Sequence, residues 1–137
     1  MIDRSTFLKR AGSLFVMALI GRARIRLPAA SDLHHPDPRA GITSEHVLSA
    51  TDIGDLGTKK VLGAYDAARE RPEIFDGLAC ACGCTDKPEH RSLLVCYETK
   101  QPTGCTSCRE EAMLVAELAH AGKTLAEIRL AVDKKYG

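Results

Sequence analysis

All the cysteines of this chain lie close together. Six of them fall between residues 80 and 108, and the 137-residue chain has no others. The pattern is Cys80-x-Cys82-x-Cys84-x5-His90-x5-Cys96-x8-Cys105-x2-Cys108. A thiol can bind a soft metal ion, exchange electrons with another thiol, or form half of a disulfide. We therefore expect the chemistry of the protein in this segment.

The spacing of the cysteines favours a metal site. Gly83 indicates an irregular turn that could bring three sulfurs to one ion, and cysteines so close in sequence do not readily form unstrained disulfides with each other. Thiolates suit Zn(II) and Cu(I), and His90 lies between the two groups of cysteines. The predicted ligands of a Cu or Zn ion are Cys80, Cys82, Cys84, His90, Cys96, Cys105 and Cys108.

Two other uses of the cysteines stay open. Six is an even number, and small domains in oxidising compartments are commonly held by disulfides, so the chain could be a disulfide-stabilised binding module. Cys105 and Cys108 could instead form the redox pair of a thiol–disulfide oxidoreductase, because the positive end of a helix dipole lowers the pKa of a thiol. No Ser/His/Asp or paired-carboxylate pattern indicates a hydrolase, and we do not expect an enzyme of that kind.

Helices are expected to position the cysteines. Residues 58–70 predict a helix with Thr58 as its N-cap, Pro72 marks its stop or restart, and a short helix is expected near residues 90–97. The buried stripe of the first helix is predicted at Val61, Leu62, Tyr65 and Ala68. The expected fold class is a small all-α domain that carries a Cys-rich loop.

The C-terminal third predicts an αα-hairpin. Thr106 or Ser107 can cap a helix that runs to about Ala121, and Gly122 suits its left-handed C-terminal stop. Residues 124–127 form a capping box that opens a second helix. The apolar positions are Ala112, Val115, Leu118 and Ala119 in the first helix, and Leu125, Ile128, Leu130 or Ala131, and Val132 in the second.

The N-terminal part has the pattern of an export signal. Residues 1–30 hold six basic residues and one acidic residue, a net charge of +5, and the remainder holds 13 and 17, a net of −4. Residues 4–9 resemble a twin-arginine signal in which Ser5 replaces the second arginine, and residues 29–31 offer a cleavage site. The alternative is an amphipathic N-terminal helix that is never removed.

Three segments follow from these patterns: an export signal at 1–31, an irregular tether at 32–57, in which only residues 44–49 could form a helical turn, and the helical domain at 58–137. The apolar run at 11–20 is shorter than the about 20 residues that a bilayer requires, so no stable transmembrane span is expected after processing. The acidic body with few aromatic residues argues against a nucleic-acid partner. The expected location is periplasmic or otherwise extracytoplasmic.

Residues 58–137 resemble the PCYCGC-motif family of exported bacterial proteins and lipoproteins. The matching segments are Leu78-Ala-Cys-Ala-Cys-Gly-Cys84, His90-Arg-Ser-Leu-Leu-Val-Cys-Tyr97, Cys105-Thr-Ser-Cys108, and Gly122-Lys-Thr-Leu-Ala-Glu-Ile-Arg129 followed by Asp133-Lys-Lys-Tyr136. The resemblance implies a metal-binding role that serves sequestration, delivery or structural stabilisation, with all six cysteines and His90 on matching positions. The chain departs from the family at Ala79 and Ala81, where the motif has proline or aromatic residues, and it has no lipobox cysteine.

A looser resemblance runs to the thiol-reductase subunit of cytochrome c maturation. It rests on the C-x-x-C and on the closing Gly-Lys-x-x-x-Glu-Ile…Tyr-Gly pattern. It implies a redox role for Cys105 and Cys108, or a partnership in cytochrome or cofactor maturation. The expected partners are therefore a metal ion and a membrane or periplasmic metalloprotein.

Overall fold

The computed structural model describes residues 33–84 and 87–137, and every regular element within them is helical. The α-helices are α1 (Ala50–Ile53), α2 (Lys59–Glu70), α3 (Pro72–Asp76), α4 (Leu93–Tyr97), α5 (Gln101–Gly104), α6 (Thr106–His120) and α7 (Leu125–Tyr136), and the 3-10 helices are η1 (Gly54–Leu56) and η3 (Pro88–His90). The predicted all-α class is confirmed. The predicted export signal lies outside the described residues, among which no helix has the length and apolar character to cross a membrane.

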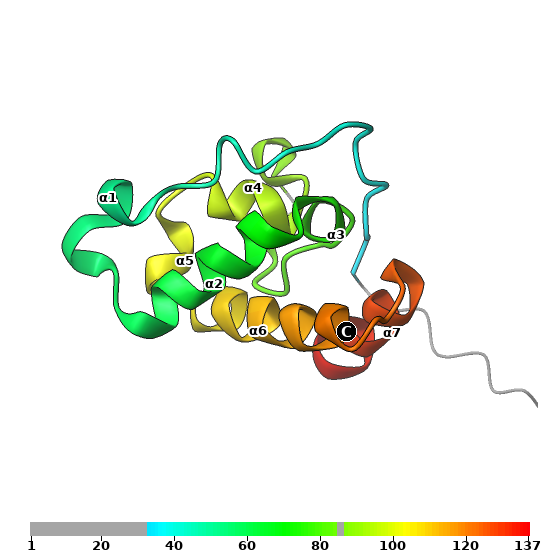
Figure 1. Cartoon of the computed structure of the whole chain (residues 1–137). Helices are drawn as coiled ribbons and strands as arrows, with labels where there is room; N and C mark the ends of the chain where they lie inside the picture. Colours follow the sequence, from blue (N-terminus) through cyan, green and yellow to red (C-terminus); the bar gives the residue numbers. More distant parts are fainter. Residues whose placement is uncertain (1–32, 85–86) are drawn as a thin grey trace, which may run out of the picture.

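Helix α2 forms as its sequence predicts. The Thr58 hydroxyl accepts a hydrogen bond from the Val61 amide at 3.3 Å, which satisfies one of the free N–H groups of the first turn. The buried face of α2 packs against α6, and Figure 1 shows these two helices side by side. Pro72 ends α2 and opens α3, because proline fits the first turn of a helix but not its interior.

Helices α6 and α7 form the predicted αα-hairpin. Gly122 adopts φ +77°, a left-handed conformation that suits glycine, and both hydrogen bonds of the Thr124–Glu127 capping box are present. Ile128 and Val132 are buried, whereas Leu130 is 54% exposed. The predicted N-cap of α6 is wrong: Cys105 takes that place instead of Thr106 or Ser107.

An aromatic group links the core to the cysteines. Tyr97 contacts Tyr65 and Phe75 edge to face, with ring centroids 4.9 Å and 5.7 Å apart. Its hydroxyl donates to the Cys108 carbonyl oxygen at 2.7 Å. All three rings are fully buried, so the start of α6 is anchored to the centre of the molecule.

Residues 33–57, here called the strap, are mostly irregular but pack on the helices. The strap passes along α3 and α4 before it reaches α1 (Figure 1). Its Val47 and Ile53 are buried in the core, and the Leu48 amide donates to the Tyr97 carbonyl at 3.1 Å. Within the range expected to form a helical turn, 44–49, the Val47 amide donates to the Ser44 carbonyl at 3.0 Å, and α1 follows with a capping box of Ser49 and Asp52.

One buried carboxylate ties the strap to two helices. Asp76 at the end of α3 is fully buried and accepts hydrogen bonds from the Arg39 backbone amide and from both its Nε and an Nη atom, at 2.7, 3.1 and 2.8 Å. Arg91 and the Ser92 hydroxyl donate to the same carboxylate at 2.8 and 3.0 Å. These contacts fix the loop between α3 and α4, in which three of the cysteines lie.

Candidate metal centre

The sulfur atoms from two distant parts of the chain meet at one place. Cys80 Sγ lies 3.2 Å from Cys108 Sγ, although 28 residues separate them in sequence. Cys82 Sγ lies 3.3 Å from Cys80 Sγ and 2.6 Å from Cys84 Sγ. Cys96 on α4 contacts Cys84, and their Sγ atoms lie 3.4 Å apart.

Cys105 completes the group, which we call the cysteine cluster: Cys80, Cys82, Cys84, Cys96, Cys105 and Cys108. The sulfurs of Cys105, Cys108 and Cys82 all lie within 4.8 Å of one another. All six residues are free thiols. Every cysteine that the sequence predicts as a metal ligand therefore has its sulfur close to the sulfur of another cysteine in the cluster.

The first three cysteines lie in an irregular turn, as Gly83 predicts. Gly83 has φ +77°, and its amide donates to the Cys80 carbonyl at 3.3 Å, which closes the turn. Cys80 is buried, Cys84 is half-buried and Cys82 is exposed. The cluster thus has a buried base and an open edge at Cys82.

Cys105 and Cys108 are positioned by the start of α6. Cys105 is the N-cap, and its sulfur accepts a hydrogen bond from the Cys108 amide at 3.2 Å, the bond that a serine or threonine hydroxyl commonly makes. One turn of helix brings Cys108 beneath Cys105 and into contact with Cys80. The side chain of Gln101 on α5 donates to the sulfur of Cys82 at 3.7 Å.

The buried thiols of the cluster hold their protons firmly. The pKa of Cys80 is raised, first by its hydrogen bond with Cys108 and then by burial. The hydrogen bond with Cys108 acts to lower the pKa of Cys96, and that with Cys80 acts to lower the pKa of Cys108, but other sulfur contacts and burial outweigh them, so both pKa values are raised. The net direction of the pKa shift at Cys108 is therefore opposite to the lowering that a position at a helix N-terminus favours. A metal ion that binds here must displace these protons.

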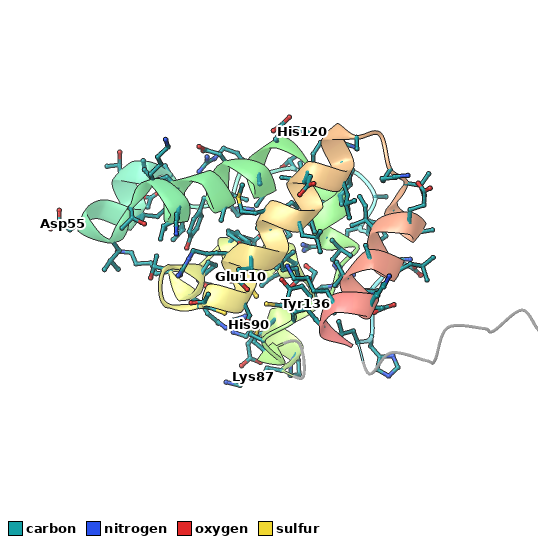
Figure 2. The ribbon with its side chains drawn as sticks, turned by 90° about the horizontal axis from the view of Figure 1, so that it is seen from below. Asp55, Lys87, His90, Glu110, His120 and Tyr136 are labelled. Carbon is teal, nitrogen blue, oxygen red and sulfur yellow. The ribbon has the colours of Figure 1, made fainter. Side chains whose placement is uncertain are left out.

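His90 ends η3, and Figure 2 shows it between Lys87 and Glu110 of α6. It belongs to neither group of three ligand atoms that lie within 4.8 Å of one another. Its Nδ1 is buried and has no hydrogen-bond partner among the described residues.

Glu111 is a buried neighbour of the cluster that the sequence analysis missed. It is fully buried on α6, and its Oε2 accepts a hydrogen bond from the Ala81 amide at 2.7 Å, inside the cysteine turn. Burial raises its pKa to about 8, although that hydrogen bond acts to lower it. A signal was present, because Glu111 lies three residues after Cys108 and four before Val115, on the buried face of the helix.

The strap also supports the cysteine turn. The ring of His35, whose side chain is 8% exposed, accepts a hydrogen bond from the Ala79 amide through Nδ1 at 3.0 Å. Its Nε2 lies 2.9 Å from Asp133 Oδ1 on α7. His35 therefore connects α7 to the residue just before Cys80.

The geometry suits metal ions bound by sulfur. Two groups of three thiols have mutually close ligand atoms: Cys80, Cys82 and Cys84, and Cys82, Cys105 and Cys108. Two sulfurs that bind one ion at about 2.3 Å can be at most about 4.6 Å apart, so only small side-chain shifts separate these groups from binding geometry. Each group joins at least one buried thiol to the exposed Cys82.

Comparison with known protein families gives a match over most of the chain. A family model described as a protein of unknown function with PCYCGC motif matches residues 44–137. This range includes the second half of the strap and every helix of the described residues. No match was found among curated proteins or among solved structures.

Proposed function

The chain belongs to the PCYCGC-motif family, and because the function of that family is unknown, we propose one from the geometry of its thiols: the protein binds a soft or borderline metal ion, Cu(I) or Zn(II), in the cysteine cluster. The observation that carries this proposal is the convergence of six free thiols from the cysteine turn, α4 and α6. Thiolates are the preferred ligands of both ions.

The sets of ligands favour Cu(I) over Zn(II). Each close group has three sulfurs, which matches the trigonal coordination that Cu(I) accepts. Structural Zn(II) sites are almost always tetrahedral and need a fourth ligand. Cys108, 3.2 Å from Cys80, and Cys96, 3.4 Å from Cys84, are candidates for a fourth ligand of the first group.

The alternative as a thiol–disulfide oxidoreductase has less support. Such an enzyme exchanges electrons through one pair of thiols, whereas Cys108 lies 3.2 Å from Cys80, and both Cys105 and Cys108 lie close to Cys82. The other four thiols of the cluster would also have no part in an exchange between Cys105 and Cys108. Metal binding gives a role to at least three of them, because Cys80, Cys82 and Cys84 form a close group of their own.

We extend the proposal to where and how the protein works. The basic and apolar segment at 1–31 supports export, and a metal-binding protein outside the cytoplasm would sequester an ion or deliver it to a metalloprotein. The exposure of Cys82 favours delivery, since a partner thiol can reach it. Cell fractionation followed by mass measurement of the N-terminus tests the export and the cleavage.

Thiol protection tests the metal-binding proposal. The reduced protein is mixed anaerobically with Cu(I) or Zn(II), alkylated, and analysed by mass spectrometry. We expect the ion to slow alkylation at both Cys82 and Cys105, because one cluster holds both thiols. Cys105→Ser should weaken this protection at Cys82, whereas Ser107→Ala, two residues further along the same helix turn, should leave it unchanged.

The same experiment can reject the proposal. If neither ion changes the alkylation of any cysteine while the circular dichroism spectrum shows a folded protein, the cluster does not bind these metals. If Cys105→Ser and Ser107→Ala behave alike, Cys105 is not a ligand.

A further inference from the structure

Cys82 is the one residue that both close groups of thiols share. We propose, on the basis of the metal-binding function above, that the cluster holds two Cu(I) ions and that the Cys82 thiolate bridges them. One ion would be bound by Cys80, Cys82 and Cys84, and the other by Cys82, Cys105 and Cys108.

The arrangement of the sulfurs carries this inference. Cys84 contacts Cys82 on one side of the cluster, and Cys105 lies close to Cys82 and Cys108 on the other. Cys84 and Cys105 do not share a close group, so no single set of three contains both. When one ion occupies one close group, the other group still has two unbound thiols next to the Cys82 thiolate, and these three sulfurs can bind a second ion.

A thiolate at Cys82 is suited to bridging. Its sulfur keeps three lone pairs, so it can bind a second ion without losing the first. Gln101 donates an N–H group to this sulfur, which partly balances its negative charge. The other four ligands are terminal: Cys80 and Cys108 form the buried base and contact each other at 3.2 Å.

The binding step needs no electron transfer when copper enters as Cu(I). Each of the five thiols loses its proton to solvent and gives one or two Cu–S bonds, and copper stays in the same oxidation state. Cys96 is left outside both groups, in contact with Cys84. It is buried and would form part of the wall around the first ion.

Stoichiometry with single substitutions tests the bridge. The reduced full chain is titrated anaerobically with Cu(I) against a competing chelator, and the bound ions are counted by native mass spectrometry and examined by X-ray absorption. We expect two ions and a Cu–Cu scattering contribution in the unsubstituted protein. Cys84→Ser and Cys105→Ser should each keep one ion, and Cys82→Ser should weaken binding of both ions by at least about tenfold.

Cys82 is exposed, so its replacement leaves the core intact, and Ser107→Ala is the matched control that should still bind two ions. Saturation at one ion, or two ions with Cu–Cu scattering in Cys82→Ser, would overturn the bridge and leave the metal-binding function standing. A chain that binds neither Cu(I) nor Zn(II) would overturn both.

Discussion

Glu111 places an ionisable carboxyl in the interior, beside the cysteine turn. Its Oε2 accepts from Ala81, and its Oε1 has no partner among the described residues. A carboxylate in this position is poorly solvated, and burial raises the pKa of Glu111 from 4.5 to about 8. The folded protein therefore binds a proton at neutral pH that the unfolded chain releases.

This linkage predicts the effect of Glu111→Gln on stability. A raised pKa in the folded state means that stability falls as pH rises from about 4.5 to about 8, by a few kcal/mol in all. Glutamine keeps an acceptor for Ala81 and cannot ionise. We expect the substitution to stabilise the metal-free, reduced protein at pH 8 and to change little at pH 5, as measured by urea unfolding at both values.

If Glu111→Gln changed stability equally at pH 5 and pH 8, Glu111 would not titrate between these pH values. Glu110→Gln, at the neighbouring but exposed position, is the matched control. It should show no such difference between the two pH values.

At the scale of elements, the strap depends on Asp76. Burial acts to raise the pKa of Asp76, but the hydrogen bonds from Arg39, Ser92 and Arg91 outweigh it and hold the pKa at about 2, against 3.8 for a free side chain. This lowered pKa gives stability that is complete above about pH 4 and is lost as pH falls through about 2. The loss amounts to about 2 kcal/mol.

Asp76→Asn should therefore destabilise the protein by about 3 kcal/mol at pH 7, because two guanidinium groups lose their carboxylate. The variant should also lack the part of acid denaturation between pH 4 and pH 2 that Asp76 causes. Urea unfolding across pH 2–7 measures both effects. An unchanged unfolding midpoint at pH 7 would mean that the strap is held by other contacts.

The strap also makes a testable contact with the cysteine turn. His35→Ala removes the acceptor of the Ala79 amide, whereas His34→Ala changes an exposed neighbour. We expect faster hydrogen exchange at Ala79 and faster alkylation of Cys80 in the first variant only. Equal behaviour of the two variants would contradict a supporting role for His35.

The elements differ in how far the sequence predicts them. Thr58, Gly122 and the Thr124 capping box act through bonds within a few residues, so their helices could be predicted. The packing of the strap could not, because it rests on long-range contacts such as that between Arg39 and Asp76. The cysteines of the site were evident from type and spacing, but the burial of each, and the N-cap role of Cys105, depend on how α6 meets the turn.

At the scale of the whole molecule, the cysteine cluster joins parts that are distant in sequence. It connects the turn after α3 with α4 and with the start of α6. An ion bound there would cross-link these parts only in the folded state, and ligands that bind only the folded state raise stability. We expect Zn(II) or Cu(I) to raise the thermal unfolding midpoint of the reduced protein, and chelation to reverse the change.

The protein as purified anaerobically from cells provides the most direct test of the central claim. Elemental analysis and thiol counting by mass spectrometry would be done on the same sample. The account predicts stoichiometric copper or zinc, with all six thiols free once the metal is removed. A folded protein that carries no metal and has its six cysteines joined in disulfides would contradict it.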